Sequence, residues 1–232
     1  MSTYFVSGRQ LALRLEPIVN LRTNKVVGYE ALSRFVEKKS KDSISDYEGY
    51  FLNLSPCALI SVISSQLEIY QKWHSQHPEI YANKILFLNV RRDLLEDDFF
   101  VSMFLPFSKT FKIAIEIDAS ACILNNVMRR RVDELTDLGI SVWVDDYAGD
   151  IAINHQHWDG VKIDKFAFWS SFENESNPLS DLDMYKIMNR HCSTNNRNPT
   201  LLAEGIESEA HLSHAIASGF ELGQGYYWAS RQ

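Results

Sequence analysis

Polar residues stand at the ends of several short apolar stretches of this sequence. The clearest stretch is residues 140–146, in which four of the first five residues are apolar and β-prone and two carboxylates follow. Because adjacent carboxylates repel, a strand end that keeps both ionised favours a cation between them. A solvated Asp-Asp turn is the alternative interpretation of an isolated pair. Similar strand ends recur along the chain, and together they carry Glu30, Asn89, Glu116, Asp145, Asp146, Lys162, Asp164, Glu204 and Gln224.

This set of side chains indicates metal-assisted chemistry on a phosphate. Carboxylate and amide oxygens without paired His or Cys suit hard cations such as Mg²⁺, Mn²⁺ or Ca²⁺. Two such ions ~3.5–4 Å apart can activate a water and stabilise the leaving oxygen of a phosphoryl displacement. Asp145 and Asp146 are placed to bridge them, and Lys162 would orient the water or offset charge in the transition state. Arg34, which follows Glu30 closely, would bind a phosphate with its forked guanidinium.

Each of these residues also has a purely structural explanation. Asn89 would bond a loop backbone, and Lys162 would pair with Asp145 or Asp164 across a barrel mouth. Glu30 and Arg34 would be an ordinary i,i+4 pair at the start of a helix. The coincidence of all of them favours a functional site.

The hydrophobic pattern predicts the elements that must position these residues. A first strand at 11–18 is expected to end at Pro17, because Pro is tolerated mainly at strand ends and edges. Ser120 is expected to cap a helix that stops at Gly139. Residues 170–177 and 193–198 are expected to be loops. The other predicted strands are 25–32, 84–90, 112–118, 140–146, 160–164, 200–206 and 219–227, and the predicted helices lie within 46–77, 93–105, 120–138, around 182–188 and at 207–217.

Eight short strands, mostly separated by helices, predict an α/β fold of the (β/α)₈ barrel type. In such barrels the catalytic groups lie at the carboxyl ends of the strands, which is where the polar residues occur here. The absence of a repeat or a linker-like tract predicts one domain over residues 1–232. Trp143, in the middle of an apolar stretch, is expected to be a core residue.

Charge and composition exclude some classes of partner. The net charge of −7 argues against a nucleic acid polymer, because phosphate-backbone recognition needs clustered Lys and Arg. No signal peptide and no apolar run of ~20 residues is visible, so no membrane association is expected. The three cysteines are odd in number and far apart, which is typical of a reducing, cytoplasmic location.

The sequence resembles the EAL domain family of cyclic di-GMP phosphodiesterases from about Leu13 to Trp228. The segment Gly28-Tyr-Glu-Ala-Leu-Ser-Arg34 holds the Glu-x-Leu-x-Arg motif of that family. The other matching segments, in family order, are Glu16-Pro-Ile, Leu88-Asn-Val90, Ile115-Glu-Ile117, Val144-Asp-Asp-Tyr147, Val161-Lys-Ile-Asp164, Ala203-Glu-Gly-Ile-Glu207 and Gln224-Gly-Tyr-Tyr227.

The resemblance implies a modified TIM barrel with one antiparallel strand and hydrolysis of cyclic di-GMP to linear pGpG. It implies a two-metal site for Mg²⁺ or Mn²⁺, with Ca²⁺ inhibitory, and a possible homodimer. The implied metal ligands are Glu30, Asn89, Glu116, Asp145 and Asp146. The implied catalytic residues are Lys162, Glu204 and Gln224, and those that bind substrate are Leu32, Arg34 and Asp164.

Three departures from the family pattern bear on activity. Active members usually have Glu-x-Thr-Glu where this chain has Glu116-Ile-Asp-Ala119, so the second glutamate is replaced. The loop after the Asp-Asp pair, usually Phe-Gly-Thr-Gly, is Tyr147-Ala-Gly-Asp150 here, and Glu16 stands where Gln is usual. Two hypotheses follow: an active phosphodiesterase, or a catalytically inactive EAL-like regulator that binds cyclic di-GMP or a partner protein without hydrolysis.

Overall fold

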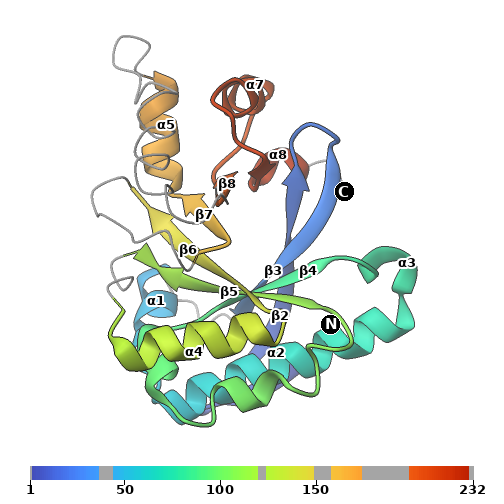
Figure 1. Cartoon of the computed structure of the whole chain (residues 1–232). Coiled ribbons are helices and arrows are strands. Elements are labelled where there is room, and N and C mark those ends of the chain that lie inside the picture. The colour runs from blue at the N-terminus through green and yellow to red at the C-terminus, as the bar shows by residue number, and fades with distance from the viewer. Residues whose placement is uncertain (1, 37–43, 120–123, 149–157, 174–198, 230–232) are drawn as a thin grey trace.

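The computed structural model describes residues 2–36, 44–119, 124–148, 158–173 and 199–229. Within these ranges the strands form one sheet in chain order from β1 to β9, and β2 also pairs with β9, so that β2–β9 close into a barrel (Figure 1). The strands are β1 (Thr3–Val6), β2 (Arg9–Asn20), β3 (Lys25–Phe35), β4 (Ile85–Asn89), β5 (Lys112–Asp118), β6 (Ser141–Tyr147), β7 (Gly160–Ile163), β8 (Thr200–Ala203) and β9 (Leu222–Gly223).

One barrel strand runs against all the others. β2 is antiparallel to both of its barrel neighbours, β3 and β9, whereas the successive pairs from β3 to β9 are parallel. The prediction of a modified TIM barrel with one antiparallel strand is therefore confirmed. Outside the barrel, β1 forms a hairpin with β2 that was not expected. Its turn, Ser7-Gly8, has positive φ at both residues, as a tight two-residue hairpin turn requires.

Several strand boundaries differ from the predictions; β2 and β3, for example, extend beyond the predicted 11–18 and 25–32. Pro17 does not end the first strand, because it lies where β2 pairs with β3 alone and β9 pairs only with Val19 and Asn20. A missing N–H costs little at a position with one paired side. The last two strands are shorter than expected: β8 ends before Glu204, and β9 is followed by a short helix rather than by more strand.

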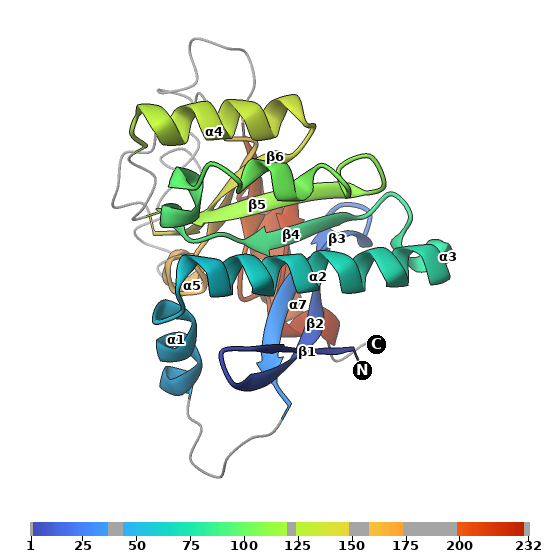
Figure 2. The same ribbon diagram turned by 90° about the horizontal axis from the view of Figure 1, so that it is seen from below.

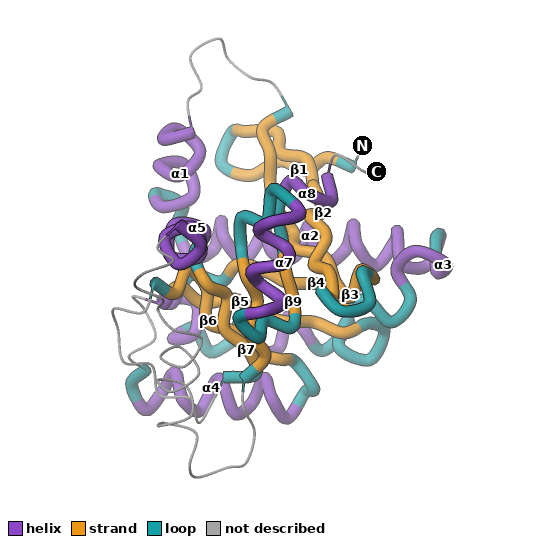
Figure 3. The backbone as a smooth tube through the Cα atoms, turned by 90° about the horizontal axis from the view of Figure 1, so that it is seen from above, coloured by secondary structure: helices purple, strands orange, loops and turns teal. Residues whose placement is uncertain are grey.

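The helices cover the outside of the barrel. α2 and α4 run outside β4–β6 on one side (Figure 2), and α7 lies on the side opposite α2 (Figures 1 and 3). None of the described helices is long and apolar enough to cross a membrane. The helices are α1 (Ile44–Leu52), α2 (Pro56–Gln76), α3 (Pro78–Tyr81), η1 (Arg92–Glu96), η2 (Val101–Phe104), α4 (Asn126–Asp137), α5 (Lys165–Glu173), α7 (Glu209–Ala217) and α8 (Tyr226–Ala229).

Some helix predictions were wrong in detail. The expected helix at 93–105 is two short 3₁₀ helices, η1 and η2. α4 is capped by Asn125, whose side chain accepts a hydrogen bond from the backbone N–H of Met128, and it ends before Gly139 as expected. α5 occupies the first part of the expected loop at 170–177. Ser120, the remainder of that loop, the expected helix around 182–188 and the loop at 193–198 lie outside the described residues.

The barrel interior contains an apolar layer. Successive side chains of a strand point to opposite faces, so only every second residue of each strand enters the interior. Phe87 and Trp143 pack edge to face there, with ring centroids 5.1 Å apart. Gly160 makes room for Trp143, because a Cβ at that position would collide with the indole ring. The buried members of this layer are Ile18, Phe87, Ala114, Trp143, Leu202 and Leu222.

Candidate active site

A polar layer lies directly above the apolar layer. Moving two residues toward the carboxyl end of a parallel strand keeps the side chain on the interior face and raises it by one layer. Phe87 is thus followed by Asn89, and Trp143 by Asp145. The same step leads from Gly28, Ala114, Gly160, Leu202 and Leu222 to Glu30, Glu116, Lys162, Glu204 and Gln224.

Lys162 is the centre of this polar layer. Its side chain is only 1% exposed, and its Nζ lies 2.8 Å from Glu204 Oε1, 2.9 Å from Asp145 Oδ1 and 3.1 Å from Glu116 Oε1. Glu30 Oε2 is 3.5 Å away. The alternative in which Lys162 merely pairs with Asp145 does not account for four carboxylates around one ammonium. Four carboxylates around one ammonium leave the polar layer with a surplus of negative charge.

Glu30 is held by hydrogen bonds from two amides. Asn89 Nδ2 donates to Glu30 Oε1 at 2.8 Å, and Gln224 Nε2 donates to Glu30 Oε2 at 2.6 Å. The structural alternative for Asn89, a bond to a loop backbone, is thus replaced by a bond within the site. Glu30 and Arg34 both lie on β3, so they are not an i,i+4 pair of a helix.

A bulge in β6 brings both aspartates of the Asp-Asp pair to the same place. In a regular strand the side chains of Asp145 and Asp146 would point to opposite faces. The β6–β7 pairing is irregular between Val144 and Tyr147, and Asp146 has a left-handed backbone with φ of 52°. Such bulges redirect a side chain. As a result, ligand oxygens of Asp145, Asp146 and Glu204 lie within 4.8 Å of one another.

The donor set fits a divalent cation. Asp145, Asp146 and Glu204 offer three carboxylates in one place, and oxygen ligands of this kind suit Mg²⁺ or Mn²⁺. Buried polar atoms normally have hydrogen-bond partners. Among the described residues, however, Glu116 Oε2 has neither a hydrogen bond nor an ion pair, and Glu116 Oε1 and Asp145 Oδ1 have only the shared Lys162 ammonium as a partner. A cation bound at this layer would satisfy them and offset the surplus charge.

The ionisation of the site reflects this crowding. Burial, with the repulsion of Glu30 and Asp145, raises the pKa of Glu116 well above its usual range despite the opposing effect of Lys162. Burial likewise raises the pKa of Glu204 to about 7, against the pull of Lys162. Lost solvation and the charge of Asp145 raise the pKa of Asp146 to about 6, although that residue is largely exposed.

Lys162 and Glu30 remain charged in this setting. Burial lowers the pKa of the Lys162 ammonium, but the surrounding carboxylates, Asp145 and Glu116 first, outweigh it and raise that pKa well above its usual range. Burial would raise the pKa of Glu30, but the charge of Lys162 and the hydrogen bonds from Gln224 and Asn89 lower it overall. The protonated Lys162 is therefore suited to hold an anion or a water, and it is unsuited to act as a general base.

The three residues expected to bind substrate surround this layer in different ways. Leu32 and Arg34 share the inner face of β3 with Glu30, Leu32 half-buried and Arg34 exposed. The Arg34 guanidinium lies 5.9 Å from the ring centroid of Tyr47. Asp164 is half-buried and caps α5, because its Oδ1 accepts hydrogen bonds from the backbone N–H groups of Phe166 and Ala167 at 2.9 and 3.2 Å.

Sequence reasoning singled out Glu16 on this face and passed over Arg14. Glu16 and Arg14 of β2 stand opposite Glu30 and Leu32 of β3, and directly paired residues share a face of the sheet. The signal for Arg14 was the alternation along the first strand, which places residues 14, 16 and 18 on one face.

The departures from the family pattern lie next to this site. Ala119 follows β5 and is only 3% exposed, packed in the main hydrophobic core. Of the loop after the Asp-Asp pair, Tyr147 is buried and Ala148 is exposed, whereas Gly149 and Asp150 lie outside the described residues.

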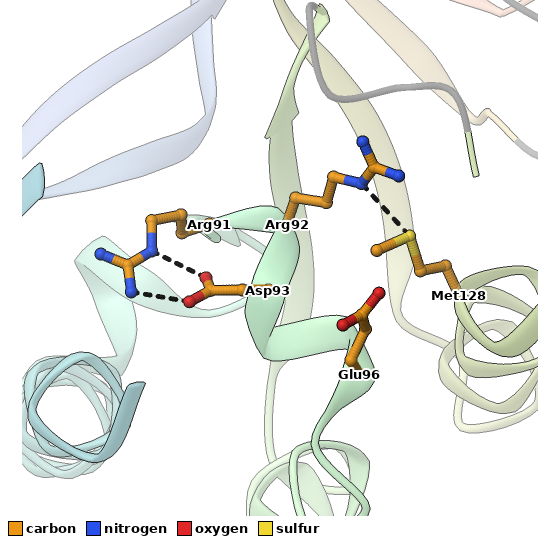
Figure 4. A pocket seen from close by; sticks show the side chains of 5 residues that line it. All are labelled: Arg91, Arg92, Asp93, Glu96 and Met128. Atoms are coloured by element: carbon orange, nitrogen blue, oxygen red, sulfur yellow. Dashed lines mark hydrogen bonds and ion pairs between the residues drawn. The ribbon is translucent and has the colours of Figure 1, made fainter. Parts of the chain in front are cut away.

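An open pocket of about 310 Å³ lies on η1, just beyond the end of β4, and is lined by Arg91, Arg92, Asp93, Glu96 and Met128 (Figure 4). Its arginines already have partners. Arg91 forms a two-pronged contact with Asp93, both distances 2.7 Å, and Arg92 Nε lies 3.4 Å from the sulfur of Met128. No residue expected to be functional lines this pocket.

Comparison with known proteins gives the family and the fold. The EAL domain family matches residues 3–231. The EAL enzyme Bd1971, in its cAMP and cyclic-di-GMP bound form, aligns with a TM-score of 0.72 and 19% identity over 94% of this chain and 61% of that chain. This chain therefore spans less than two thirds of the length of Bd1971. A comparison with curated proteins gave no match.

Two further solved structures align over most of both chains. The PaMucR phosphodiesterase in complex with c-di-GMP has a TM-score of 0.72 and 17% identity, with 94% of this chain and 90% of that chain covered. The EAL domain of Xanthomonas citri FimX in complex with c-diGMP has a TM-score of 0.68 and 13% identity, with 94% and 86% covered. At these identities the likeness concerns the fold. With a family match over nearly the whole sequence and a barrel of the same fold, this chain belongs to the EAL domain family.

Proposed function

We propose that this protein is a metal-dependent phosphodiesterase that hydrolyses cyclic di-GMP to linear pGpG. The observation that carries the proposal is the crowding of Asp145, Asp146 and Glu204 within 4.8 Å beside the buried Lys162. This arrangement combines an anionic cation site with a fixed positive charge at the mouth of an EAL barrel. Solved structures of the same fold, a phosphodiesterase in complex with c-di-GMP among them, support the choice of substrate.

In this proposal the carboxylate layer holds Mg²⁺ or Mn²⁺. Glu30, Asn89, Glu116, Asp145 and Asp146 would hold these ions, and Glu204, which lies with Asp145 and Asp146, would offer them a further carboxylate. When bound there, the ions would supply Lewis acidity toward water and phosphate oxygens. Ca²⁺ accepts a larger and more flexible coordination shell than Mg²⁺, which supports the expectation that it inhibits.

The protein's own groups have distinct proposed roles. Lys162 stays protonated, so it orients the attacking water and offsets negative charge on the phosphate in the transition state. Glu204 holds Lys162 in place, and Gln224 fixes the orientation of Glu30 through its hydrogen bond. Arg34 binds a phosphate, and Leu32 contacts the substrate beside it. Asp164 contacts the substrate through the carboxylate oxygen that does not cap α5.

A second candidate function is supported by one observation. Ala119 is buried at the end of β5, where active members usually carry a glutamate. The family resemblance implies that this glutamate helps to hold the loop after the Asp-Asp pair, a role that Ala119 cannot fill. This favours a regulator that binds cyclic di-GMP, or a partner protein, without cleaving it.

Turnover of cyclic di-GMP separates the two candidates. The purified protein would be incubated with cyclic di-GMP in Mg²⁺, in Mn²⁺ and with added Ca²⁺, and pGpG followed by chromatography. Hydrolysis that disappears in Asp145→Asn establishes the enzyme. Binding by calorimetry in Ca²⁺ without turnover in Mg²⁺ or Mn²⁺ establishes the regulator and contradicts the phosphodiesterase.

A homodimer is a further proposal, to be tested by sedimentation.

A further inference from the structure

The β2–β3 hairpin rises above the rest of the barrel mouth. β4 pairs with β3 only as far as Ala31, opposite Leu88, whereas β2 stays paired with β3 out to Phe35. The four residues of β3 beyond Ala31 extend the hairpin by about 13 Å, at the usual rise of a strand. The hairpin is thus tall enough to form a wall beside anything bound over the polar layer.

The outer face of this wall is covered by helices. Ser33 accepts a hydrogen bond of 3.0 Å from Gln66 of α2, and Phe35 packs in a core cluster with Leu11, Leu54 and Val62. The residues between them in sequence point to the opposite, inner face.

The inner face of the wall presents two arginines. Arg14 stands opposite Leu32 and is therefore a diagonal neighbour of Arg34, two residues further along β3. Diagonal neighbours on one face lie about 7–8 Å apart, within reach of long side chains. Both arginines are exposed. Glu30, one layer below, is on the same face.

Within the part of the chain that the structure describes, neither arginine has an acidic partner. Among the described residues no ion pair forms at Arg14 or Arg34. The Arg34 guanidinium lies 5.9 Å from the centroid of the Tyr47 ring, and the nearby Glu30 is already held by Asn89, Gln224 and Lys162. Glu16 shares the inner face with Arg14, two residues along β2, but no ion pair joins the two among the described residues. Two guanidinium groups on one face repel each other, and an anion placed between them relieves that repulsion.

We propose that Arg14 is a second phosphate-binding residue, which together with Arg34 holds the phosphodiester of a cyclic dinucleotide that is not being cleaved. This inference rests on the proposed function and adds a residue to it. A cyclic dinucleotide carries two phosphodiesters, each with one negative charge. When one lies at the carboxylate layer with Lys162, the other extends toward the mouth, where the wall presents Arg14 and Arg34.

This assignment makes Arg14 a determinant of specificity. A substrate with two phosphodiesters gains a contact that a substrate with one phosphodiester lacks. Arg14 does not touch the reacting atoms, so its removal should weaken binding and leave the chemical step unchanged.

The test compares Arg14→Ala with a matched control, Arg22→Ala, on two substrates. Arg22 is an exposed arginine in the turn at the other end of the same hairpin, so the control makes the same change in charge far from the mouth. The substrates are cyclic di-GMP and bis(p-nitrophenyl) phosphate, which has a single phosphodiester. For Arg14→Ala we expect KM for cyclic di-GMP to rise about tenfold, with kcat within about twofold. Kinetics with bis(p-nitrophenyl) phosphate should not change.

Other results would overturn the assignment. Wild-type KM for cyclic di-GMP in Arg14→Ala, or an equal loss on both substrates, excludes a second-phosphate contact. If wild type binds but does not cleave, the same comparison is made with Kd by calorimetry in Ca²⁺. Wild-type protein that neither binds nor cleaves cyclic di-GMP refutes the proposed function and this inference together, and that failure is recognised before any substitution is made.

Discussion

Lys162 Nζ lies 2.9 Å from Asp145 Oδ1, across neighbouring parallel strands β7 and β6. The same ammonium also contacts Glu30, Glu116 and Glu204. One buried positive charge thus holds together carboxylates from strands far apart in sequence. The stability of the metal-free protein and its proposed activity should both depend on this charge.

Replacing Lys162 with Met should destabilise the metal-free protein. Removing one partner of a buried ionic network leaves the others unpaired, which costs about 3–5 kcal/mol in free energy of unfolding. This loss of stability should be largest near pH 8 and smaller near pH 6, because carboxylates that are protonated at the lower pH no longer repel one another. Denaturant unfolding without divalent cations measures it. Lys165→Met, at the exposed start of α5, is the matched control, and an equal loss in both variants would contradict the role of Lys162.

Asp145→Asn and Glu30→Ala should abolish hydrolysis and leave the fold intact. Both side chains lie in the polar layer above the apolar interior, so they contribute more to the site than to the core. We expect kcat/KM for cyclic di-GMP to fall by at least about 100-fold. Circular dichroism checks the fold, and Glu68→Gln on the exposed face of α2 serves as the control. Unfolding of both active-site variants would show that the layer is structural.

The pH dependence of stability should reveal Glu204. Its pKa is about 7 in the folded protein, above the ordinary value of 4.5. Between those values the folded state binds more protons than the unfolded state, so stability rises as pH falls and is lost as pH rises through 7. As pH falls from 8 to 4.5 without metal, the free energy of unfolding of wild type should therefore rise by up to about 3 kcal/mol relative to that of Glu204→Gln. A constant difference across this range would be evidence against the raised pKa.

Metal binding should show the opposite trend with pH. A cation binds the ionised form of Glu204, so the affinity for Mg²⁺ should fall as pH drops from 8 to 6. Calorimetry in buffers with different ionisation enthalpies would detect protons released on binding. Affinity that is independent of pH would place the ion away from this carboxylate.

Restoring the family pattern around Ala119 should raise activity or metal affinity. The variant combines Ala119→Glu with Ala148→Gly, Gly149→Thr and Asp150→Gly. Ala119→Glu alone should destabilise the protein by about 2–4 kcal/mol, because position 119 is buried in the apolar core. Steady-state kinetics and calorimetry with Mg²⁺ measure the combined variant. Unchanged activity and affinity would mean that the present loop works in another way.

Much of the fold could be predicted because local patterns matched the tertiary structure. Short apolar or alternating stretches located all the barrel strands, and the family resemblance implied that one of them is antiparallel. The 3₁₀ helices η1 and η2 were mistaken for one helix, because apolar residues such as Leu94, Leu95 and Phe104 recur at spacings that suit either helix type. The Ser7-Gly8 turn signalled the β1–β2 hairpin, but β1 is short and that signal was missed.

The sequence by itself determined which side chains form the site, since a polar residue two positions beyond an interior apolar one must lie one layer higher on the same face. It did not determine how these side chains meet. Closure of the barrel by the β2–β9 pairing brings Gln224 to Glu30, residues separated by most of the chain. The bulge in β6 turns Asp146 toward Asp145, against the alternation that a regular strand would impose. Both depend on pairing between strands, which a pattern along a single strand does not contain.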